Sequence, residues 1–328
     1  MRPTILFGGT SRERLVSTAT AQAIADALPD ADMWFQDVSG SIFATSREGL
    51  SAHDRPFEIE FRADGAWLGT VDEAMAHAAT EGRVLVLGQH GGSAENGEIQ
   101  LVAEAHGVPF TGSGSAASHL AFDKTAAKRF AALAGVYSPS SVTLEDLDEA
   151  FAHYGKLIAK PAEDGSSYGL IFVHSSQDLA AVRREAATTA YVIEPFIIGP
   201  EATCGVLEMN GEVFALPPVE IVPADGAFDY AGKYLAQTTQ EICPARFDPA
   251  INAELQRLAV KAHKAMSCRG YSRSDFIISA DGPVFLETNT LPGLTRASLY
   301  PKSLKARGIA FADFLNSQIE LAVKRAEA

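Results

Sequence analysis

The sequence predicts an α/β protein built of three parts: a parallel-sheet part, a small mixed part and a larger antiparallel part. In the first hundred residues, short buried strands alternate with helical patterns, which is typical of a parallel sheet covered by helices. After residue 200, two β-hairpin patterns follow instead. The chain has 328 residues, which is too long for one small core and indicates two or three domains.

The first predicted part covers residues 1–113. Its first strand is TILF at Thr4–Phe7, which ends at two glycines, and a helical pattern begins at Thr10. A second central strand is expected at Arg83–Gln89, where the densest apolar run of the chain lies. This run is far shorter than a membrane span requires.

The second predicted part covers residues 114–194. A helix is expected at 115–134, followed by the strands KLIAKPA and YGLIFVH on either side of a glycine–serine loop. Another helical pattern at 176–188 leads into the strand YVIEPFI. This part would therefore be a small sheet with helices of its own.

The third predicted part covers residues 195–328 and is mainly antiparallel. One hairpin is expected to turn at Asn210 and Gly211, and a second to turn at Asp281 and Gly282, because both dipeptides favour tight turns. A helix at 249–267 separates the two hairpins. A last amphipathic helix closes the chain.

The composition excludes several classes of partner and site. The net charge is −14, with 27 Lys plus Arg against 41 Asp plus Glu, so neither nucleic acid nor an anionic membrane is an expected partner. The three cysteines have neither the number for a closed disulfide framework nor the spacing of metal ligands. In the N-terminus MRPTILFGGT the apolar stretch is too short for a signal-peptide core and runs straight into glycines, so we expect no signal peptide here. We therefore expect reduced thiols and a cytoplasmic protein.

Polar side chains gather on the second predicted hairpin. Asp275 lies on its first strand, and Glu287 and Asn289 lie two apart on its second strand, so the latter pair shares a face. Arg273 lies two residues before Asp275 and shares that residue's face. Carboxylate and amide oxygens suit magnesium and phosphate, whereas the alternative is a solvated polar sheet face. The glycine- and proline-rich continuation TLPGLTRASLYP favours a ligand site.

A second candidate site follows the strand that ends near Lys160. The loop residues Gly165, Ser166 and Ser167 can present backbone N–H groups and hydroxyls to phosphates. The pattern is not a Walker A motif, in which the lysine follows the glycines. Without further support, this segment would more commonly be an ordinary hairpin loop.

Several segments in order resemble the D-alanine–D-alanine ligases of the ATP-grasp superfamily, and the resemblance spans nearly the whole chain. The segments are FGGTSRERLVS, HGGSAENGEIQ, PFTGSGSAASHLAFDK, AKPAEDGSSYG, YVIEPFIIGPEATCGVL, GKY, SRSDF and LETNTLPGLT. Each motif alone is modest, but their common order and spacing are specific. The resemblance implies a three-domain ATP-grasp fold with an N-terminal parallel-sheet domain, a small central domain and a larger antiparallel C-terminal domain.

The resemblance also implies a nucleotide site. Lys124 and Lys160 would bind the phosphates of ATP, and Lys233 would reach the γ-phosphate from a loop. The stretch from Glu194 to Glu201 would hold the adenine, with Glu201 on the ribose. Phosphoryl transfer depends on positioning and charge neutralisation, so lysines and metal-holding acids are the expected groups.

Metal and oxyanion roles follow from the same resemblance. Asp275, Glu287 and Asn289 would hold two magnesium ions, or manganese in their place. Arg273 and the backbone of Gly293 would stabilise the oxyanion of the tetrahedral intermediate. A lid that excludes water would protect the acyl phosphate between the two steps.

The implied amino-acid site uses residues from both ends of the chain. Glu13 would bind the ammonium of the first D-alanine, and His90 would lie near its carboxylate. Ser298 and Leu299 would contact the second substrate. The resemblance also places Tyr234 in this site, where its hydroxyl would form hydrogen bonds with two partner residues. These partners are Ser166 and Glu13.

Each of these roles has a plainer alternative. Thr10-Ser11-Arg12-Glu13 fits a capping box, in which Glu13 only caps its helix. Lys124 could be a solvated helical lysine, and His90 an ordinary loop histidine. The helix N-terminus after the first glycines suits a substrate carboxylate or phosphate in either case.

The chain departs from the family pattern at several positions: Leu15, Ala94, Asn96, Asp164 and Ala231. None of these changes removes a proposed phosphate, metal or oxyanion group, but they lie in substrate-side loops. The leading hypothesis is a homodimeric ligase that makes D-alanyl-D-alanine for peptidoglycan. The alternatives are a ligase with another amino-acid or hydroxy-acid acceptor, and a nucleotide-binding protein without the chemistry. Intact Arg273, Asp275, Glu287 and Asn289 argue against the last, because a pure binder needs no oxyanion donor.

Overall fold

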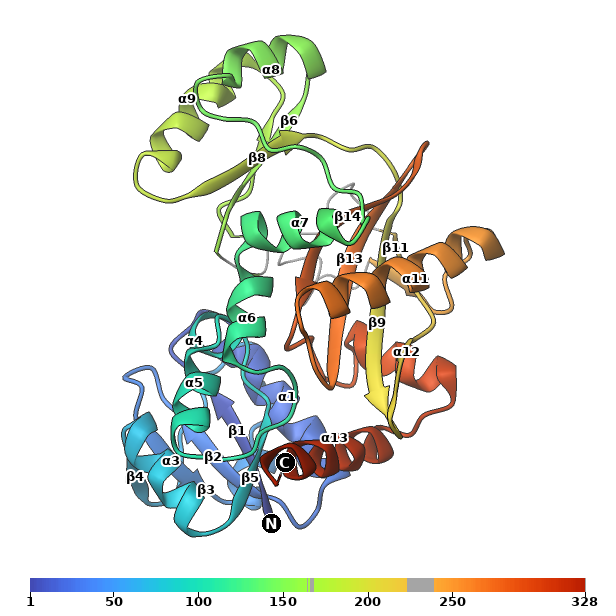
Figure 1. Cartoon of the computed structure of the whole chain (residues 1–328). Coiled ribbons are helices and arrows are strands. Elements are labelled where there is room, and N and C mark those ends of the chain that lie inside the picture. The colour runs from blue at the N-terminus through green and yellow to red at the C-terminus, as the bar shows by residue number, and fades with distance from the viewer. Residues whose placement is uncertain (164, 166–167, 223–238, 328) are drawn as a thin grey trace.

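The structure, a computed structural model, describes residues 1–163, 165, 168–222 and 239–327. It contains three sheets of five, three and six strands, which follow one another along the chain (Figure 1). The predicted division into three α/β parts is therefore confirmed. Among the described residues, no helix is long and apolar enough to cross a membrane.

The N-terminal sheet is mixed, whereas a parallel sheet was expected. Its order is β4-β3-β2-β1-β5, with bounds Trp67–Gly69, Ile42–Thr45, Asp32–Gln36, Arg2–Gly8 and Arg83–Leu87. The pairs of β1 with β2 and β5 are parallel, but β3 and β4 add antiparallel. The reason is local. Asp37 accepts hydrogen bonds from the backbone N–H groups of Ser39 and Ser41, which closes a tight turn with no room for a crossover helix.

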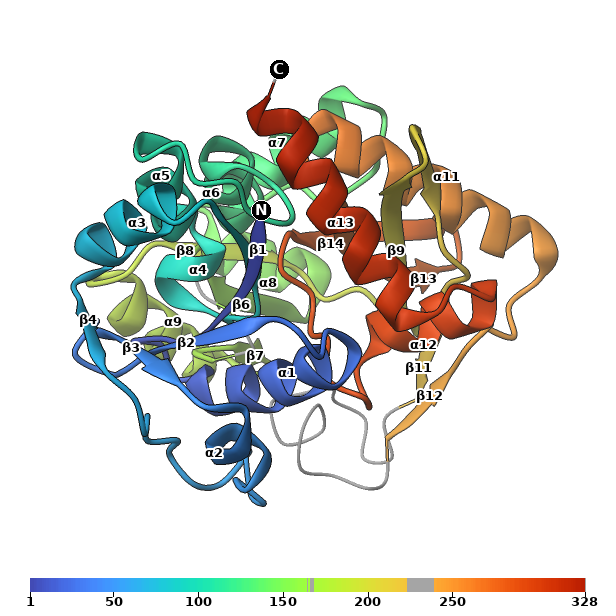
Figure 2. The same cartoon turned by 90° about the horizontal axis from the view of Figure 1, so that it is seen from below.

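Helices cover this sheet, and one of them comes from the other end of the chain. The N-terminal helices are α1 (Arg14–Ala27), α2 (Arg47–Ser51), α3 (Val71–Thr80), α4 (Gly92–Glu95) and α5 (Glu98–Ala105). The C-terminal helix α13 (Phe311–Ala326) lies beside β5 and α1 (Figure 2). Its Phe314 is fully buried and shares one apolar core with Ile5 and Ile24. The first and last segments of the chain thus fold together.

An aromatic cluster continues this core into the C-terminal part. Tyr271 lies 5.3 Å from Phe314 and 5.9 Å from Tyr300, measured between ring centroids. All three rings are buried, and the Tyr300 hydroxyl donates to the carbonyl of Val206 at 2.8 Å. Such ring pairs add stability beyond the area that they bury.

The helix expected at 115–134 is two helices, α6 (Ser115–Phe122) and α7 (Lys124–Leu133). Asp123 separates them with an extended backbone, ψ 102°. Its carboxylate accepts hydrogen bonds from the N–H groups of Thr125 and Ala126, so it ends one helix and caps the next. The break places Lys124 in the first turn of α7.

The central sheet has the order β7-β6-β8, and both of its pairs are antiparallel. Its strands are β6 (Leu157–Pro161), β7 (Ile171–Val173) and β8 (Tyr191–Pro195), covered by α8 (Leu147–Tyr154) and α9 (Ser176–Ala186). Helix α7 does not join this core, because Ala127 and Ala131 pack with Phe276 and Phe285 of the C-terminal sheet. The boundaries near 113 and 194 stay predictions, and α7 ties the two regions together.

The C-terminal sheet has the order β12-β11-β9-β13-β14, with β10 beside β9. Its elements are β9 (Glu201–Met209), β10 (Glu212–Ala215), β11 (Val219–Val222), β12 (Gln240–Ile242), α11 (Pro249–Ala265), β13 (Tyr271–Ser279), β14 (Gly282–Asn289) and α12 (Leu299–Arg307). Both predicted hairpins are present. Asn210 and Gly211 take φ of 55° and 80°, as a tight turn of two left-handed residues requires. In the second hairpin Ser279 pairs with Gly282, so the turn begins one residue earlier than expected.

A β-bulge in the second hairpin decides which side chains face the apolar core. Asp275 pairs with Glu287, but the next residue, Phe276, pairs with Phe285, so the register shifts at this point. On a regular strand Phe285 and Glu287 would share a face. The bulge separates them: Phe285 is fully buried in the core, whereas Glu287 is part-exposed on the other face.

Candidate active site

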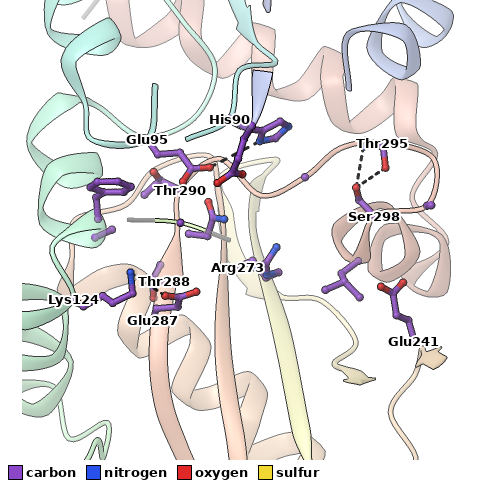
Figure 3. A pocket seen from close by; sticks show the side chains of 18 of the residues that line it. His90, Glu95, Lys124, Glu241, Arg273, Glu287, Thr288, Thr290, Thr295 and Ser298 are labelled. Atoms are coloured by element: carbon purple, nitrogen blue, oxygen red, sulfur yellow. Dashed lines mark hydrogen bonds and ion pairs between the residues drawn. The ribbon is translucent and has the colours of Figure 1, made fainter. Parts of the chain in front are cut away.

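A cavity lies where the three parts meet, and Gly165 of the predicted phosphate loop lines it. So do nine of the residues to which the resemblance gives a role: Glu13, His90, Lys124, Arg273, Glu287, Asn289, Gly293, Ser298 and Leu299. Figure 3 shows Lys124 and Glu287 on one side, His90 and Glu95 on another, and Ser298 and Glu241 opposite, with Arg273 between them. Four further predicted residues lie outside this lining: Lys160, Glu194, Glu201 and Asp275. Ser166, Lys233 and Tyr234 lie outside the described residues.

Arg273 and Asp275 on β13 form a tight pair at the floor of the site. The Arg273 Nε donates to Oδ1 of Asp275 at 2.9 Å, and Nη2 donates to Oδ2 at 2.8 Å. Thr203 on the neighbouring strand adds a third bond, from its hydroxyl to Oδ1 at 2.6 Å. Both oxygens of Asp275 are therefore engaged, and the guanidinium is held in a fixed orientation.

Lys124 and Glu287 bring opposite charges to the same wall. The Nζ of Lys124 lies 3.5 Å from Oε2 of Glu287, and the Lys124 side chain is only 9% exposed. The side chain of Glu287 is 35% exposed, so it faces the cavity. A buried lysine with a carboxylate partner is not the solvated helical lysine of the plainer alternative. This arrangement can hold phosphate and a cation side by side.

Lys160 does not line the cavity but belongs to a buried ion cluster behind it. Its Nζ lies 3.1 Å from Oε2 of Glu194, and Lys128 pairs with the other oxygen of this carboxylate. Burial lowers the pKa of Lys160 to about 8, and the nearby Glu287 opposes this shift. Sequence reasoning missed Lys128. The available signal was its position one helical turn after Lys124.

Glu13 ends the loop before α1 and is 7% exposed. Its side chain does not cap the helix, so the capping-box alternative is wrong. Instead the hydroxyl of Ser11 accepts the N–H of Glu13 at 3.1 Å and donates to the carbonyl of His90 at 2.6 Å. A Cβ on Gly165 would lie only 2.7 Å from Oε1 of Glu13, so the backbone of Gly165 approaches this carboxylate closely. Glu13 thus points into the space between two parts of the protein.

His90 is buried beside this loop and is neutral. Its Nε2 lies 2.8 Å from the hydroxyl of Thr20. Burial lowers the pKa of His90 to about 4, and the nearby charge of Arg273 lowers it further, while a hydrogen bond with the backbone of Leu291 opposes both. At neutral pH this ring can therefore offer hydrogen bonds but no positive charge.

Glu95 is a cavity residue that sequence reasoning missed. Burial and the neighbouring charge of Glu13 raise the pKa of Glu95 to about 8. Its Oε1 lies 3.9 Å from Nδ1 of His90. Two carboxyl groups close together, one inclined to stay protonated, form a site for a cation such as an ammonium. The other lining residues not predicted are Phe57, Ala121, Phe122, Glu241, Thr288, Thr290, Thr295 and Ala297.

The loop after β14 is held by its own polar groups. Asn289 Oδ1 accepts the N–H of Leu291 at 2.9 Å, and the Ser298 hydroxyl accepts the N–H of Thr295 at 3.1 Å. A Cβ on Gly293 would come within 2.9 Å of the Ser298 Oγ, so any larger residue here would displace the Ser298 hydroxyl. Ser298 and Leu299 begin α12 at the edge of the cavity.

The oxygen donors fit a magnesium ion only together with further ligands. Among the described residues, no group of three or more His, Cys, Asp or Glu could hold a metal ion. The predicted set offers two carboxylates, Asp275 and Glu287, and the amide of Asn289. Magnesium typically takes one or two protein carboxylates and completes its shell with water and substrate phosphates. The donor chemistry therefore suits a phosphate-bound magnesium rather than a protein-only site.

Two family descriptions match this chain. The one described as D-ala D-ala ligase N-terminus matches residues 2–113, and the one described as D-ala D-ala ligase C-terminus matches residues 144–320. The D-alanine--D-alanine ligase of Halalkalibacterium halodurans is 33% identical over 334 residues, covering 99% of this chain and 100% of that protein.

Solved structures agree with these matches. The VanG D-Ala:D-Ser ligase from Enterococcus faecalis superposes with a TM-score of 0.79 at 28% identity, covering 98% of this chain and 99% of that one. The D-alanine-D-alanine ligase from Coxiella burnetii gives a TM-score of 0.81 at 22% identity, covering 100% and 95%, a likeness of fold.

Proposed function

Because the chain belongs to the D-alanine–D-alanine ligase family, with its ATP-grasp fold and its use of ATP, we propose that it joins two D-alanines to D-alanyl-D-alanine for peptidoglycan synthesis. One observation supports this proposal most strongly. A single cavity brings together carboxyl groups suited to an ammonium (Glu13), a lysine–carboxylate pair suited to a metal-bound phosphate (Lys124 and Glu287), and a fixed guanidinium (Arg273).

The chemistry follows from what these groups can do. A carboxylate is a poor electrophile, so the donor D-alanine first takes the γ-phosphoryl group of ATP on a carboxylate oxygen, and ADP leaves. The amine of the second D-alanine then attacks the carbonyl carbon, and phosphate leaves as the peptide bond forms. Lys124 and Lys160 neutralise phosphate charge during the first step. Arg273 and the backbone N–H of Gly293 stabilise the oxyanion of the second step.

The donor is positioned by the opposite wall. Glu13, with Glu95 beside it, binds the ammonium of the first D-alanine. The neutral ring of His90 offers a hydrogen bond to the carboxylate of the same substrate. Ser298 and Leu299 contact the second D-alanine. By the family resemblance, Tyr234 hydrogen-bonds with Ser166 and Glu13 and so closes the site. Glu287, Asn289 and Asp275 would hold magnesium together with the phosphates, and the bound ion would supply charge neutralisation during phosphoryl transfer. On the same grounds, Glu194, Glu201 and Lys233 would contact the nucleotide.

The test is phosphate release from ATP and magnesium, with each D- and L-amino acid in turn and with mass spectrometry of the products. We expect D-alanine to stimulate release and D-alanyl-D-alanine to accumulate. If no amino acid stimulates release and no dipeptide forms, the proposed function is wrong.

The alternative acceptor is another amino acid or a hydroxy acid. The likeness to a structure named as a D-Ala:D-Ser ligase favours keeping this candidate. Ala94 and Asn96, two of the departures from the family pattern, flank Glu95 of the cavity. Competition between D-alanine and D-serine or D-lactate, read from the product ratio, distinguishes these acceptors. The proposal also includes a cytoplasmic homodimer. Sedimentation of the purified chain would test the dimer, and fractionation of cells would test the location.

A further inference from the structure

Helix α7 carries two lysines one turn apart, and each has a carboxylate partner in a different part of the protein. Lys124 faces Glu287 of the C-terminal sheet, whereas Lys128 pairs with Glu194 on β8 of the central sheet. Like charges at this spacing destabilise a helix by themselves. Their presence here is therefore explained by the two partners, between which α7 lies (Figure 1).

The buried carboxylate of Glu194 forms ion pairs with two lysines, Lys128 and Lys160. Its side chain is 3% exposed, that of Lys128 is 6% exposed and that of Lys160 is 13% exposed. A buried carboxylate needs one positive partner, and losing the last partner is strongly unfavourable. With two lysines, Glu194 has one ionic partner more than it requires. Burial and the neighbouring charge of Lys160 lower the pKa of Lys128 to about 7, whereas the adjacent carboxylate favours its charged form.

We infer that Lys128 is a positioning residue: it stays paired with Glu194 when Lys160 turns to nucleotide phosphate, and it thereby allows Lys160 to bind that phosphate. Lys160 is the more exposed of the two lysines and lies within the influence of Glu287 at the cavity. Without Lys128, Lys160 would be the one counter-ion of Glu194 left among the described residues. Turning Lys160 toward a phosphate would then leave a buried carboxylate without a partner, and nucleotide affinity would fall.

This inference rests on the proposed phosphate-binding role of Lys160, and it concerns binding rather than chemistry. Lys128→Met keeps the length of the side chain and removes its charge. We expect its affinity for a non-hydrolysable ATP analogue with magnesium, measured by calorimetry, to be at least about tenfold weaker than that of the native chain. The KM for ATP should rise with it, while kcat at saturating ATP should stay within about twofold.

Removal of the carboxylate provides the rescue. In Glu194→Gln no buried carboxylate is left to lose its partner, so adding Lys128→Met to this variant, which gives the double variant, should weaken binding of the analogue far less than the same change does in the native chain. Lys128→Arg keeps the charge and should stay close to native. A native-like affinity of Lys128→Met, or an equal loss of affinity from Lys128→Met with and without Glu194→Gln, overturns the inference, because a merely structural role predicts no dependence on Glu194.

Two further comparisons keep the result interpretable. If Lys128→Met does not fold, the double variant is compared with Glu194→Gln, and a difference in affinity beyond about twofold overturns the inference. If the native chain binds the analogue but forms no dipeptide from D-alanine, the proposed function fails while the counter-ion role of Lys128 is still decided by the binding data.

Discussion

Arg273 and Asp275 lie two residues apart on one strand and are joined by two parallel hydrogen bonds of 2.9 Å and 2.8 Å. The sequence suggested separate roles, a metal ligand and an oxyanion donor. In this structure the carboxylate orients the guanidinium, so a change in either residue should disturb the other.

Arg273→Lys should lower turnover by roughly a hundredfold or more, because a lysine keeps the charge but loses the planar, two-bond geometry. The KM for ATP should change much less. Steady-state kinetics of phosphate release measures both. Arg257→Lys is the matched control, since Arg257 lies on the exposed face of α11 and pairs only with Glu254 among the described residues. Equal losses in both variants would argue against a specific role for Arg273.

Glu287→Gln should lower turnover by orders of magnitude, because it removes one carboxylate charge from a site that must hold magnesium and phosphate. The fold should persist, because this side chain is 35% exposed. Turnover is measured over a range of magnesium concentrations, and folding by thermal unfolding. Glu254→Gln on α11 is the control. Near-native turnover at saturating magnesium would mean that these carboxylates only form a solvated polar face of the sheet and hold no metal.

Gly165→Ala should weaken binding of the donor D-alanine without unfolding the chain. The added Cβ would lie 2.7 Å from Oε1 of Glu13, so this carboxylate must move. A displacement of this size can cost about ten- to a hundredfold in KM or turnover. Gly165→Ala/Glu13→Asp, with a shorter acid, should recover part of the loss. If KM for D-alanine is unchanged in Gly165→Ala, Glu13 is not the ammonium site.

The free energy of unfolding should fall as pH decreases from about 6.5 to about 4. Burial lowers the pKa of His90 and of His263 to about 4, so between these values the unfolded chain binds more protons than the folded chain. Each histidine contributes on the order of 3 kcal/mol above pH 6.5, which is lost as pH falls through the folded pKa. Glu95 acts in the opposite sense: its pKa is raised to about 8, so its contribution is lost as pH rises from 4.5 to 8.

Urea unfolding of the native chain and of His263→Gln at several pH values separates these groups. His263 packs in the C-terminal part, with its Nδ1 2.7 Å from the Ser272 hydroxyl, away from the cavity. The variant should show a clearly weaker dependence on pH below 6.5. An identical slope in both proteins would mean that His263 titrates normally in the folded state.

Local patterns were sufficient to predict much of the fold. The turn at Asn210 and Gly211, the buried run at Arg83–Gln89 and the alternation of strands and helices each depend on nearest neighbours along the chain. The single helix expected at 115–134 was wrong because a capping aspartate outweighed the helical pattern at one position, Asp123.

The family resemblance identified nine residues that line the cavity, but not the residues that act on them. Glu95 lies within the segment HGGSAENGEIQ, but its raised pKa arises from burial beside Glu13, which is remote in sequence. Lys128 looks like any helical lysine until β8 places Glu194 against it. Contacts of this kind depend on long-range packing, which periodicity does not report.

By itself the sequence determined the order of elements, the three-part α/β class and the family, because these follow from local pattern and motif order. Only the tertiary structure decided that α13 closes the first sheet and that His90 is neutral. It also decided, through one bulge, that Glu287 faces the cavity while Phe285 faces the core. The physical reason is that a face, a pKa and a counter-ion are set by what surrounds a side chain, and those surroundings come from segments far apart in the chain.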